Sequence, residues 1–275
     1  MPSLHQLRLA LNGRIPPFAK EAYLKLREIN ASQRALPDFL IIGAQKAGTT
    51  SLFNYLCMHP QIVGSVPKEI FYFCSHPERG ERWYRRHFPR RSKLESGRRI
   101  CGEATPIMLC VEQAPRQAHA LVPDAKIIAI LREPAARAVS HYHHQVRFGH
   151  ESRPIDEVFS LENIRRWEQG DCPDLPQRWY FSWSDYTTGL GHWLAHYRKG
   201  QVLVLEAEAM FTDTQAVYDQ SCGFLNMPRH KLPQITAFNA GQPKSQKPQA
   251  FQCLKTAFDR QNKALQKLGY PMSWA

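Results

Sequence analysis

The sequence has no long run of apolar residues and no closely spaced pair of cysteines. Its leading segment, residues 1–30, mixes leucines with arginines and lysines and lacks an apolar core as long as that of a signal peptide or a membrane span. The seven cysteines have neither disulfide-like nor metal-ligand spacing, which is typical of free thiols in a reducing compartment. We therefore expect a cytoplasmic protein, with the bacterial cytosol as the default location.

Acidic residues are too few to balance the basic ones. The chain has 36 lysines and arginines against 24 aspartates and glutamates, a formal net charge of +12. Such an excess predicts an anionic partner, for example an acidic glycan, a nucleic acid or a membrane surface. Residues 79–99 hold the densest basic run, interleaved with Trp83, Tyr84, His87 and Phe88. The run alone is typical of a solvated face, whereas its aromatic residues favour a rim that binds sugars or lipid headgroups.

Residues 37–52 carry the most informative pattern in the chain. An apolar strand over 39–43 runs into a loop bracketed by Gly43 and Gly48, and a helix begins at Thr49. The glycine spacing matches an ATP-type phosphate loop, but Thr49 stands where that motif has lysine, and Lys46 lies inside the loop. Backbone amides at the helix start predict a phosphate site. The alternative is an ordinary strand-turn-helix whose glycines only permit a tight turn.

A second candidate anchor follows the apolar run 125–131. Arg132 stands at the carboxyl end of this predicted strand, where ligands bind in open α/β sheets. Ser140 follows about two helical turns later. An NTPase would place an aspartate after this strand to hold magnesium, and none is present. The alternative is a surface arginine at a strand end and a serine packed on a helix.

With both segments in view, the chain resembles the sulfotransferase family that uses 3′-phosphoadenosine 5′-phosphosulfate (PAPS). The resemblance is closest to the carbohydrate, heparan sulfate type branch and to related bacterial enzymes. It implies a 3′-phosphate site at Arg132 and Ser140, adenosine 3′,5′-bisphosphate (PAP) as the product, and no required metal. It also implies that the 5′-phosphosulfate is held by Gln45, Lys46, Ala47, Gly48, Thr49, Thr50 and Ser51.

A third motif is the segment 67–73, in which Lys68 and Glu69 precede three aromatic residues. In the resembled branch this glutamate is the catalytic base, and an acceptor hydroxyl that attacks sulfur must lose a proton to such a group. We expect Lys46 to donate to the departing oxygens and Lys68 to assist at the sulfonyl oxygens. Taken alone, Lys68 and Glu69 also fit a surface ion pair.

Weaker candidates for acceptor binding are Glu103, Thr105 and His141. The resemblance implies the first two, although Thr105 followed by Pro106 also fits a helix N-cap. The histidine groups at 141–144 and 192–196 lack the spacing and the glutamate of a zinc site, so we expect no metal. The family's late donor-closing loop is not matched at 238–247, where Gly241 and Lys244 are partial substitutes.

These patterns predict an α/β fold with one domain, in which helices flank a central parallel sheet and a P-loop-like loop binds phosphosulfate. We expect residues 1–36 to form an N-terminal helical extension, packed on the domain or acting as a weak interfacial anchor, and 37–275 to form the sulfotransferase domain. Strands are expected near 39–43, 100–103, 126–131 and 201–205, with a short extended piece near 61–65. Helices are expected at 49–58, 81–88, 112–121, 134–148, 154–168, 184–199, 212–225 and 249–268.

The predicted function is transfer of a sulfuryl group from PAPS to a hydroxyl or amine, with a carbohydrate or glycolipid as acceptor. The alternatives are a P-loop-type kinase or NTPase and a non-catalytic binder of acidic polymers. No nucleic acid partner is expected, whereas weak contact with a membrane surface is compatible with the leading segment. The sequence defines neither the acceptor nor the oligomeric state.

Overall fold

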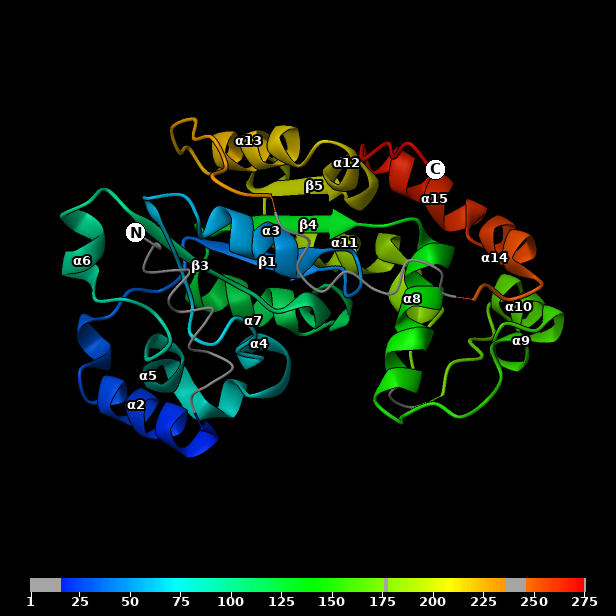
Figure 1. The fold of residues 1–275 in the computed structure, drawn as a ribbon, viewed down its shortest axis with the longest axis horizontal. Helices are drawn as coiled ribbons and strands as arrows, with labels where there is room; N and C mark the ends of the chain where they lie inside the picture. The colour runs from blue at the N-terminus through cyan, green and yellow to red at the C-terminus, as the bar shows by residue number, and fades with distance from the viewer. Residues whose placement is uncertain (1–15, 176–177, 236–245, 275) are drawn as a thin grey trace.

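The computed structural model describes residues 16–175, 178–235 and 246–274, and its centre is a five-stranded sheet (Figure 1). The strand order is β2-β3-β1-β4-β5, and every neighbouring pair is parallel. The predicted parallel α/β fold is therefore confirmed. The strands are β1 (Phe39–Gly43), β2 (Ile62–Gly64), β3 (Ile100–Ala104), β4 (Lys126–Leu131) and β5 (Val202–Glu206).

The central strands are buried along nearly their whole length. All five residues of β1 and the last five of β4 are inaccessible to solvent, as expected for parallel strands covered on both faces. In the register, Leu40 lies opposite Glu103 on one side and Ile127 on the other. The carboxyl ends of β1 and β4 therefore meet at one edge of the sheet, and the loops that follow them are neighbours.

Helices pack against the sheet in two groups. The first consists of α3 (Thr49–Leu56), α12 (Ala207–Thr212) and α13 (Thr214–Phe224), and the second of α7 (Ala114–Leu121) and α11 (Tyr186–Leu194). Tyr186, Leu190 and Trp193 of α11 are all buried, so this side of the helix belongs to the core. The Trp193 indole also donates a hydrogen bond to the Met108 carbonyl (3.2 Å).

A second, smaller apolar core lies beside the sheet, on the right of Figure 1. It is built from α8 (Pro134–Arg147), α9 (Ile155–Val158), α10 (Leu161–Glu168) and α14 (Phe251–Ala257), with α15 (Asp259–Lys267) continuing the chain. Its largest fully buried rings include Phe159, Tyr180, Phe181 and Phe258. Since α8 follows β4 directly, this second core holds the helix that leaves the carboxyl edge of the sheet.

The helix α2 (Pro17–Ile29) packs beside α5 (Gly80–Arg85), at the lower left of Figure 1 and away from the second core. Arg86, which is only 4% exposed, forms ion pairs with Glu21 (3.1 Å) and Glu28 (3.0 Å) of α2. The Trp83 ring lies against the guanidinium groups of Arg79 and Arg86. One member of the predicted basic run is therefore buried and paired, while most of the others remain exposed.

Several predicted helices are shorter or divided. Residues 154–168 form two helices because Ser160 ends the first segment and caps α10 by accepting from the Asn163 amide (3.3 Å). In the same way Asp213 separates α12 from α13 and accepts from the Ala216 amide (3.0 Å). Predicted helix 249–268 is divided at Phe258. The remaining helical elements are α4 (Tyr72–Ser75), α6 (Arg91–Glu95), η1 (Ala31–Gln33), η2 (Pro77–Arg79), η3 (Pro106–Cys110), η4 (Ser182–Ser184) and η5 (Lys199–Gln201).

No helix in the three described ranges is long and apolar enough to cross a lipid bilayer.

The packing of α11 gives a testable prediction for stability. Trp193→Ala removes a fully buried indole and leaves a cavity, so we expect the free energy of unfolding to fall by about 3–5 kcal/mol. Trp179→Ala is the matched control, because Trp179 is 37% exposed and its loss leaves no closed cavity. Urea denaturation of both variants measures the difference. Equal losses for the two tryptophans would contradict the central position of α11.

Candidate active site

The loop after β1 brings a helix start to the carboxyl edge of the sheet. It is fixed by hydrogen bonds from the Ala44 amide to the Ile130 carbonyl (2.7 Å) and from the Ala47 amide to the Ala44 carbonyl (3.1 Å). Gly48 has a φ of 92°, a left-handed conformation that favours glycine, and a β-carbon there would also displace the terminal methyl group of Met210, which would lie 2.6 Å away. Because α3 begins directly after this loop, its N-terminal amides and the positive end of its dipole lie at the loop. This is the geometry of an anion site at a helix N-terminus.

Lys46 lies within a group of positive charges. Its ammonium is partly buried, and burial together with Arg147, Arg132 and Arg137 lowers its pKa. The Arg132 guanidinium donates to the Lys46 carbonyl (3.3 Å), so the two sequence motifs meet in space. Among the residues that the structure describes, no carboxylate forms an ion pair with any of these four cations. A cluster of this kind attracts an anion, and a phosphate or sulfate group fits its chemistry.

The segment after β4 is held by its own set of hydrogen bonds. The Tyr186 hydroxyl donates to the Arg132 carbonyl (2.8 Å), and the Glu133 carboxylate caps α8 by accepting from the amides of Ala135 and Ala136 (3.0 and 2.8 Å). Ser140 is half-buried on α8, about two turns further along. Arg132 is thereby placed next to the loop of Lys46, at the edge where the resemblance implies the 3′-phosphate.

Glu69 occupies the loop between β2 and α4. Its carboxylate accepts from the Lys68 ammonium (2.6 Å), and the side chains of Glu69 and Lys68 are 39% and 18% exposed. The neighbouring residues Ile70 and Phe73 are buried, which anchors the loop in the core. The ion pair of the alternative interpretation is therefore present, and the carboxylate remains accessible to a molecule from solvent.

Glu103 and Thr105 are fully buried, unlike residues that touch an acceptor. The Tyr84 hydroxyl donates to one carboxylate oxygen of Glu103 (2.5 Å) and the Thr105 hydroxyl to the other (2.7 Å). Thr105 does stand at the first position before η3, but its side chain makes no capping hydrogen bond. Its hydroxyl instead accepts from the Ile70 amide (3.2 Å). Burial raises the pKa of Glu103 to about 7, because a charged carboxylate is poorly solvated there.

His141 is also buried, being 1% exposed. Its ring stacks on Trp183 at 5.5 Å between centroids and lies next to the Arg137 guanidinium. Burial and Arg137 lower its pKa to about 2, so it is neutral. Its side chain is out of reach of a molecule from solvent in this arrangement. His144, one turn further along α8, is only half-buried. Burial and the Lys46 ammonium lower the pKa of His144, whereas the Glu69 carboxylate raises it. Both charges are therefore close enough to His144 to act on it electrostatically.

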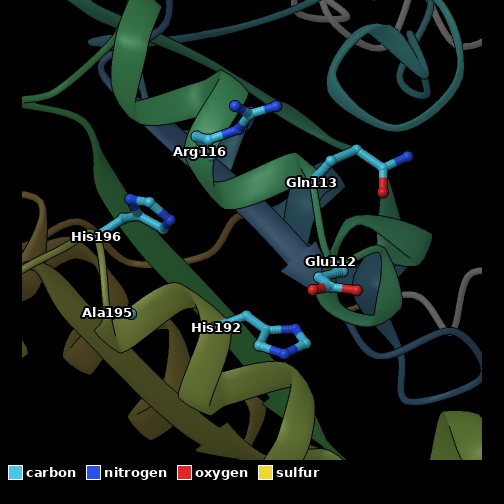
Figure 2. Close-up of a pocket in the computed structure, with 6 residues that line it drawn as sticks. All are labelled: Glu112, Gln113, Arg116, His192, Ala195 and His196. Atoms are coloured by element: carbon cyan, nitrogen blue, oxygen red, sulfur yellow. The ribbon is translucent and has the colours of Figure 1, made fainter.

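A separate pocket lies between α7 and α11 (Figure 2). The side chains of Glu112 and His192 point toward the same space, and Arg116, Gln113, Ala195 and His196 complete the lining. None of these residues belongs to the predicted site.

Within the described part of the chain, no three histidine, cysteine or acidic side chains are arranged to hold a metal ion. Of the late loop 238–247, residues 238–245, including Gly241 and Lys244, lie outside the described residues.

The fold and the site define a class of protein: a single α/β domain with a modified phosphate loop at the carboxyl edge of a parallel sheet. Comparison with known proteins makes this more specific. The model of the sulfotransferase domain family matches residues 36–265. The chain therefore belongs to the sulfotransferase family, which confirms the resemblance found in the sequence.

Two relatives and one solved structure extend the comparison. The chain is 32% identical to mouse bifunctional heparan sulfate N-deacetylase/N-sulfotransferase 4 over 71% of its length and 23% of that protein's. It is 29% identical to human heparan sulfate glucosamine 3-O-sulfotransferase 6, over 82% of its length and 60% of that protein's. The crystal structure of a sulfotransferase from Alicyclobacillus acidocaldarius aligns with a TM-score of 0.67 at 26% identity, covering 87% of this chain and 99% of that one. The chain thus spans about a quarter of the first relative and three fifths of the second.

The buried Glu103 gives a prediction for the pH dependence of stability. The pKa of Glu103 in the folded protein is about 7, above the usual value of 4.5, so folding favours the protonated carboxyl group. The stability that this group contributes is complete below about pH 4.5 and is lost as the pH rises through about 7. Glu103→Gln cannot ionise. We expect its free energy of unfolding to depend less on pH across this window than that of the wild type, as measured by urea denaturation at several pH values. Parallel curves for the two proteins would contradict a raised pKa at this site.

Proposed function

We propose that this protein is a PAPS-dependent sulfotransferase whose base is Glu69. The observation that carries the proposal is the group of cations around Lys46, where the Arg132 guanidinium meets the Lys46 carbonyl and no carboxylate of the described residues forms an ion pair with the group. The Glu69 carboxylate is accessible. An anionic donor would complete this group of charges. A base at its edge would serve a nucleophile that arrives from solvent.

The donor would occupy the loop between β1 and α3. The amides at the start of α3, with the hydroxyls of Thr49, Thr50 and Ser51, suit the 5′-phosphosulfate, and Gln45, Ala47 and Gly48 complete the loop. Arg132 and Ser140 suit the 3′-phosphate. Membership of the family supports PAPS as the donor. The reaction requires no metal, because the sulfuryl group is already activated by its phosphate leaving group.

The chemical step is an in-line displacement at sulfur. The acceptor oxygen, or nitrogen, forms a new bond to sulfur as the bond between sulfur and the 5′-phosphate oxygen breaks. The proton of the acceptor moves to Glu69, and the electron pair of the broken bond leaves with PAP. Lys46 and the loop amides stabilise the negative charge that grows on the leaving phosphate, and Lys68 interacts with the sulfonyl oxygens.

A carbohydrate or a glycolipid is the proposed acceptor. The relatives named for heparan sulfate support this class, and the net charge of +12 suits an anionic glycan. A cytoplasmic location remains part of the proposal.

Two substitutions test the roles in catalysis. We expect Lys46→Ala and Glu69→Gln each to reduce transfer of labelled sulfate by at least about 100-fold, since a positioned base alone contributes that much. Glu69→Gln should leave the calorimetric affinity for PAP unchanged, whereas Lys46→Ala should weaken it. Glu78→Gln is the matched control, because Glu78 is an acid that is 67% exposed and belongs to no part of the site. A screen over glycans, glycolipids and phenols, analysed by mass shift, identifies the acceptor.

Assays of ATP turnover and of heparin binding, combined with PAP calorimetry, distinguish the two alternative functions. Magnesium-dependent turnover of ATP without PAP binding would indicate a kinase or NTPase. Binding to heparin that survives Lys46→Ala, in a protein that does not bind PAP, would indicate a binder of acidic polymers.

A further inference from the structure

We propose that Thr105 and Glu103 are positioning residues, which hold the Glu69 loop against the strand that leads into the donor loop. This inference rests on the proposed function, because it concerns the geometry of the proposed base. Neither residue touches solvent, so their effect on Glu69 is indirect.

Thr105 is hydrogen-bonded to both halves of the site. Its amide donates to the Ile41 carbonyl of β1 (3.1 Å), two residues before the strand ends at Gly43. Its hydroxyl accepts from the amide of Ile70, which directly follows Glu69 (3.2 Å), and from the amide of Phe71 at a longer distance (3.4 Å). A single residue therefore connects the donor-loop strand with the backbone beside the proposed base.

Glu103 determines how this hydroxyl is oriented. Its carboxylate accepts the hydroxyl proton of Thr105 at 2.7 Å, so the oxygen of Thr105 presents its lone pairs to the two amides. The Tyr84 hydroxyl occupies the other carboxylate oxygen, and Tyr84 stays neutral because burial and Glu103 raise its pKa. Each buried polar group in this chain of contacts has a partner, which makes the arrangement specific.

The backbone after Glu69 needs such support. Phe71 has a φ of 61°, a left-handed conformation that is unfavourable for a residue with a side chain and persists only when its surroundings hold it. The Thr105 hydroxyl is one of the groups that contact this backbone. Without it, we expect the loop to relax and the Glu69 carboxylate to lose its fixed position, while the donor loop stays in place.

Thr105→Val tests the inference, because valine keeps the branched shape and the backbone hydrogen bond to Ile41 but has no hydroxyl. Thr105→Ser is the matched control that retains the hydroxyl. We expect the valine variant to show faster amide hydrogen exchange in a peptide covering 67–73, with unchanged exchange in β1 and α3. We also expect release of sulfate from saturating PAPS to fall at least tenfold, with the KM for PAPS within twofold of wild type, and the serine variant to stay near wild type in both measurements.

The experiment distinguishes a failure of the proposed function from a failure of the positioning role. If the wild type neither binds PAP nor consumes PAPS, the proposed function fails, and the positioning role fails with it. If the wild type is active and Thr105→Val exchanges and reacts as the wild type does, only the positioning role is overturned. Faster exchange throughout β3 and β1 would show a general structural role and would also overturn it.

A different observation carries a second inference: we propose that α2 contacts an anionic lipid surface. The exposed face of α2 carries Phe18, Tyr23, Leu26 and Ile29, which are 76%, 50%, 66% and 75% exposed. At 3.6 residues per turn the four residues fall within an arc of about 140°, so they share one side of the helix. The opposite side is occupied, since Leu24 is buried.

Basic side chains lie on α2 and around its C-terminal end. Lys25 is exposed on the helix itself, the Arg82 guanidinium donates to the Glu28 carbonyl (3.4 Å) at the end of α2, and Arg91 donates to the Ser32 carbonyl (2.6 Å) just beyond it. An apolar helix face with cations nearby is complementary to an anionic bilayer. Two other partners fit this surface less well. A soluble polyanion would contact only the cations and leave the apolar side chains exposed, and a second copy of this chain would bring its own cations against these, which repel each other.

Sedimentation with vesicles tests this surface. We expect the wild type to bind vesicles of phosphatidylcholine with about one third phosphatidylserine much more strongly than vesicles of phosphatidylcholine alone. The double variant Leu26→Glu with Ile29→Glu should bind the anionic vesicles at least tenfold more weakly, and Leu161→Glu, which changes an exposed leucine of α10, should not. Three outcomes would each overturn the inference. The wild type and the double variant bind the anionic vesicles equally; the wild type does not bind them; or the wild type forms a dimer in ultracentrifugation that the double variant abolishes.

Discussion

The hydrogen bonds of Thr105 connect the two parts of the proposed site. Its amide is bound to β1 and its hydroxyl to the backbone after Glu69, so the position of the loop depends on the central strand of the sheet. The sheet supplies rigidity because β1 lies between β3 and β4 and is buried throughout. A rigid strand and one bridging residue would limit how far the Glu69 carboxylate can move relative to the proposed donor loop, as the proposed mechanism requires.

The cations around Lys46 have a cost for the folded protein. Burial and three nearby guanidinium groups lower the pKa of this lysine, which means that its charged form is disfavoured in the absence of an anion. Arg137 is fully buried beside it and is stabilised by the Tyr180 carbonyl (2.7 Å) and the Ser184 hydroxyl (2.7 Å) instead of a carboxylate. A bound anion would relieve this repulsion. The unfavourable arrangement is therefore consistent with a site selected for binding an anion at the expense of stability.

Local patterns were sufficient to predict the strands and the loop. The runs 39–43 and 126–131 are apolar enough to identify buried parallel strands, and Lys46 and Arg132 follow them directly, so their meeting at one edge of the sheet could be predicted. The roles of Glu103 and Thr105 could not. Tyr84 lies 19 residues before Glu103 and Ile70 lies 35 before Thr105, and no sequence spacing indicates that these groups share one buried network. The divisions of the helices at Ser160 and Asp213 depend on single capping hydrogen bonds, which the apolar periodicity does not reveal.

The net positive charge has more than one physical origin, and the fold separates them. Arg86 is buried and neutralised by Glu21 and Glu28, so it contributes to packing between α2 and α5 and not to the field outside the protein. Arg132, Arg137 and Lys46 lie close enough together near the proposed donor loop for the two arginines to lower the pKa of the lysine. Arg82 and Arg91 reach backbone carbonyls near the end of α2 and remain exposed. A total charge taken from composition combines these groups with the other exposed lysines and arginines, so it does not indicate where on the surface a partner would be attracted.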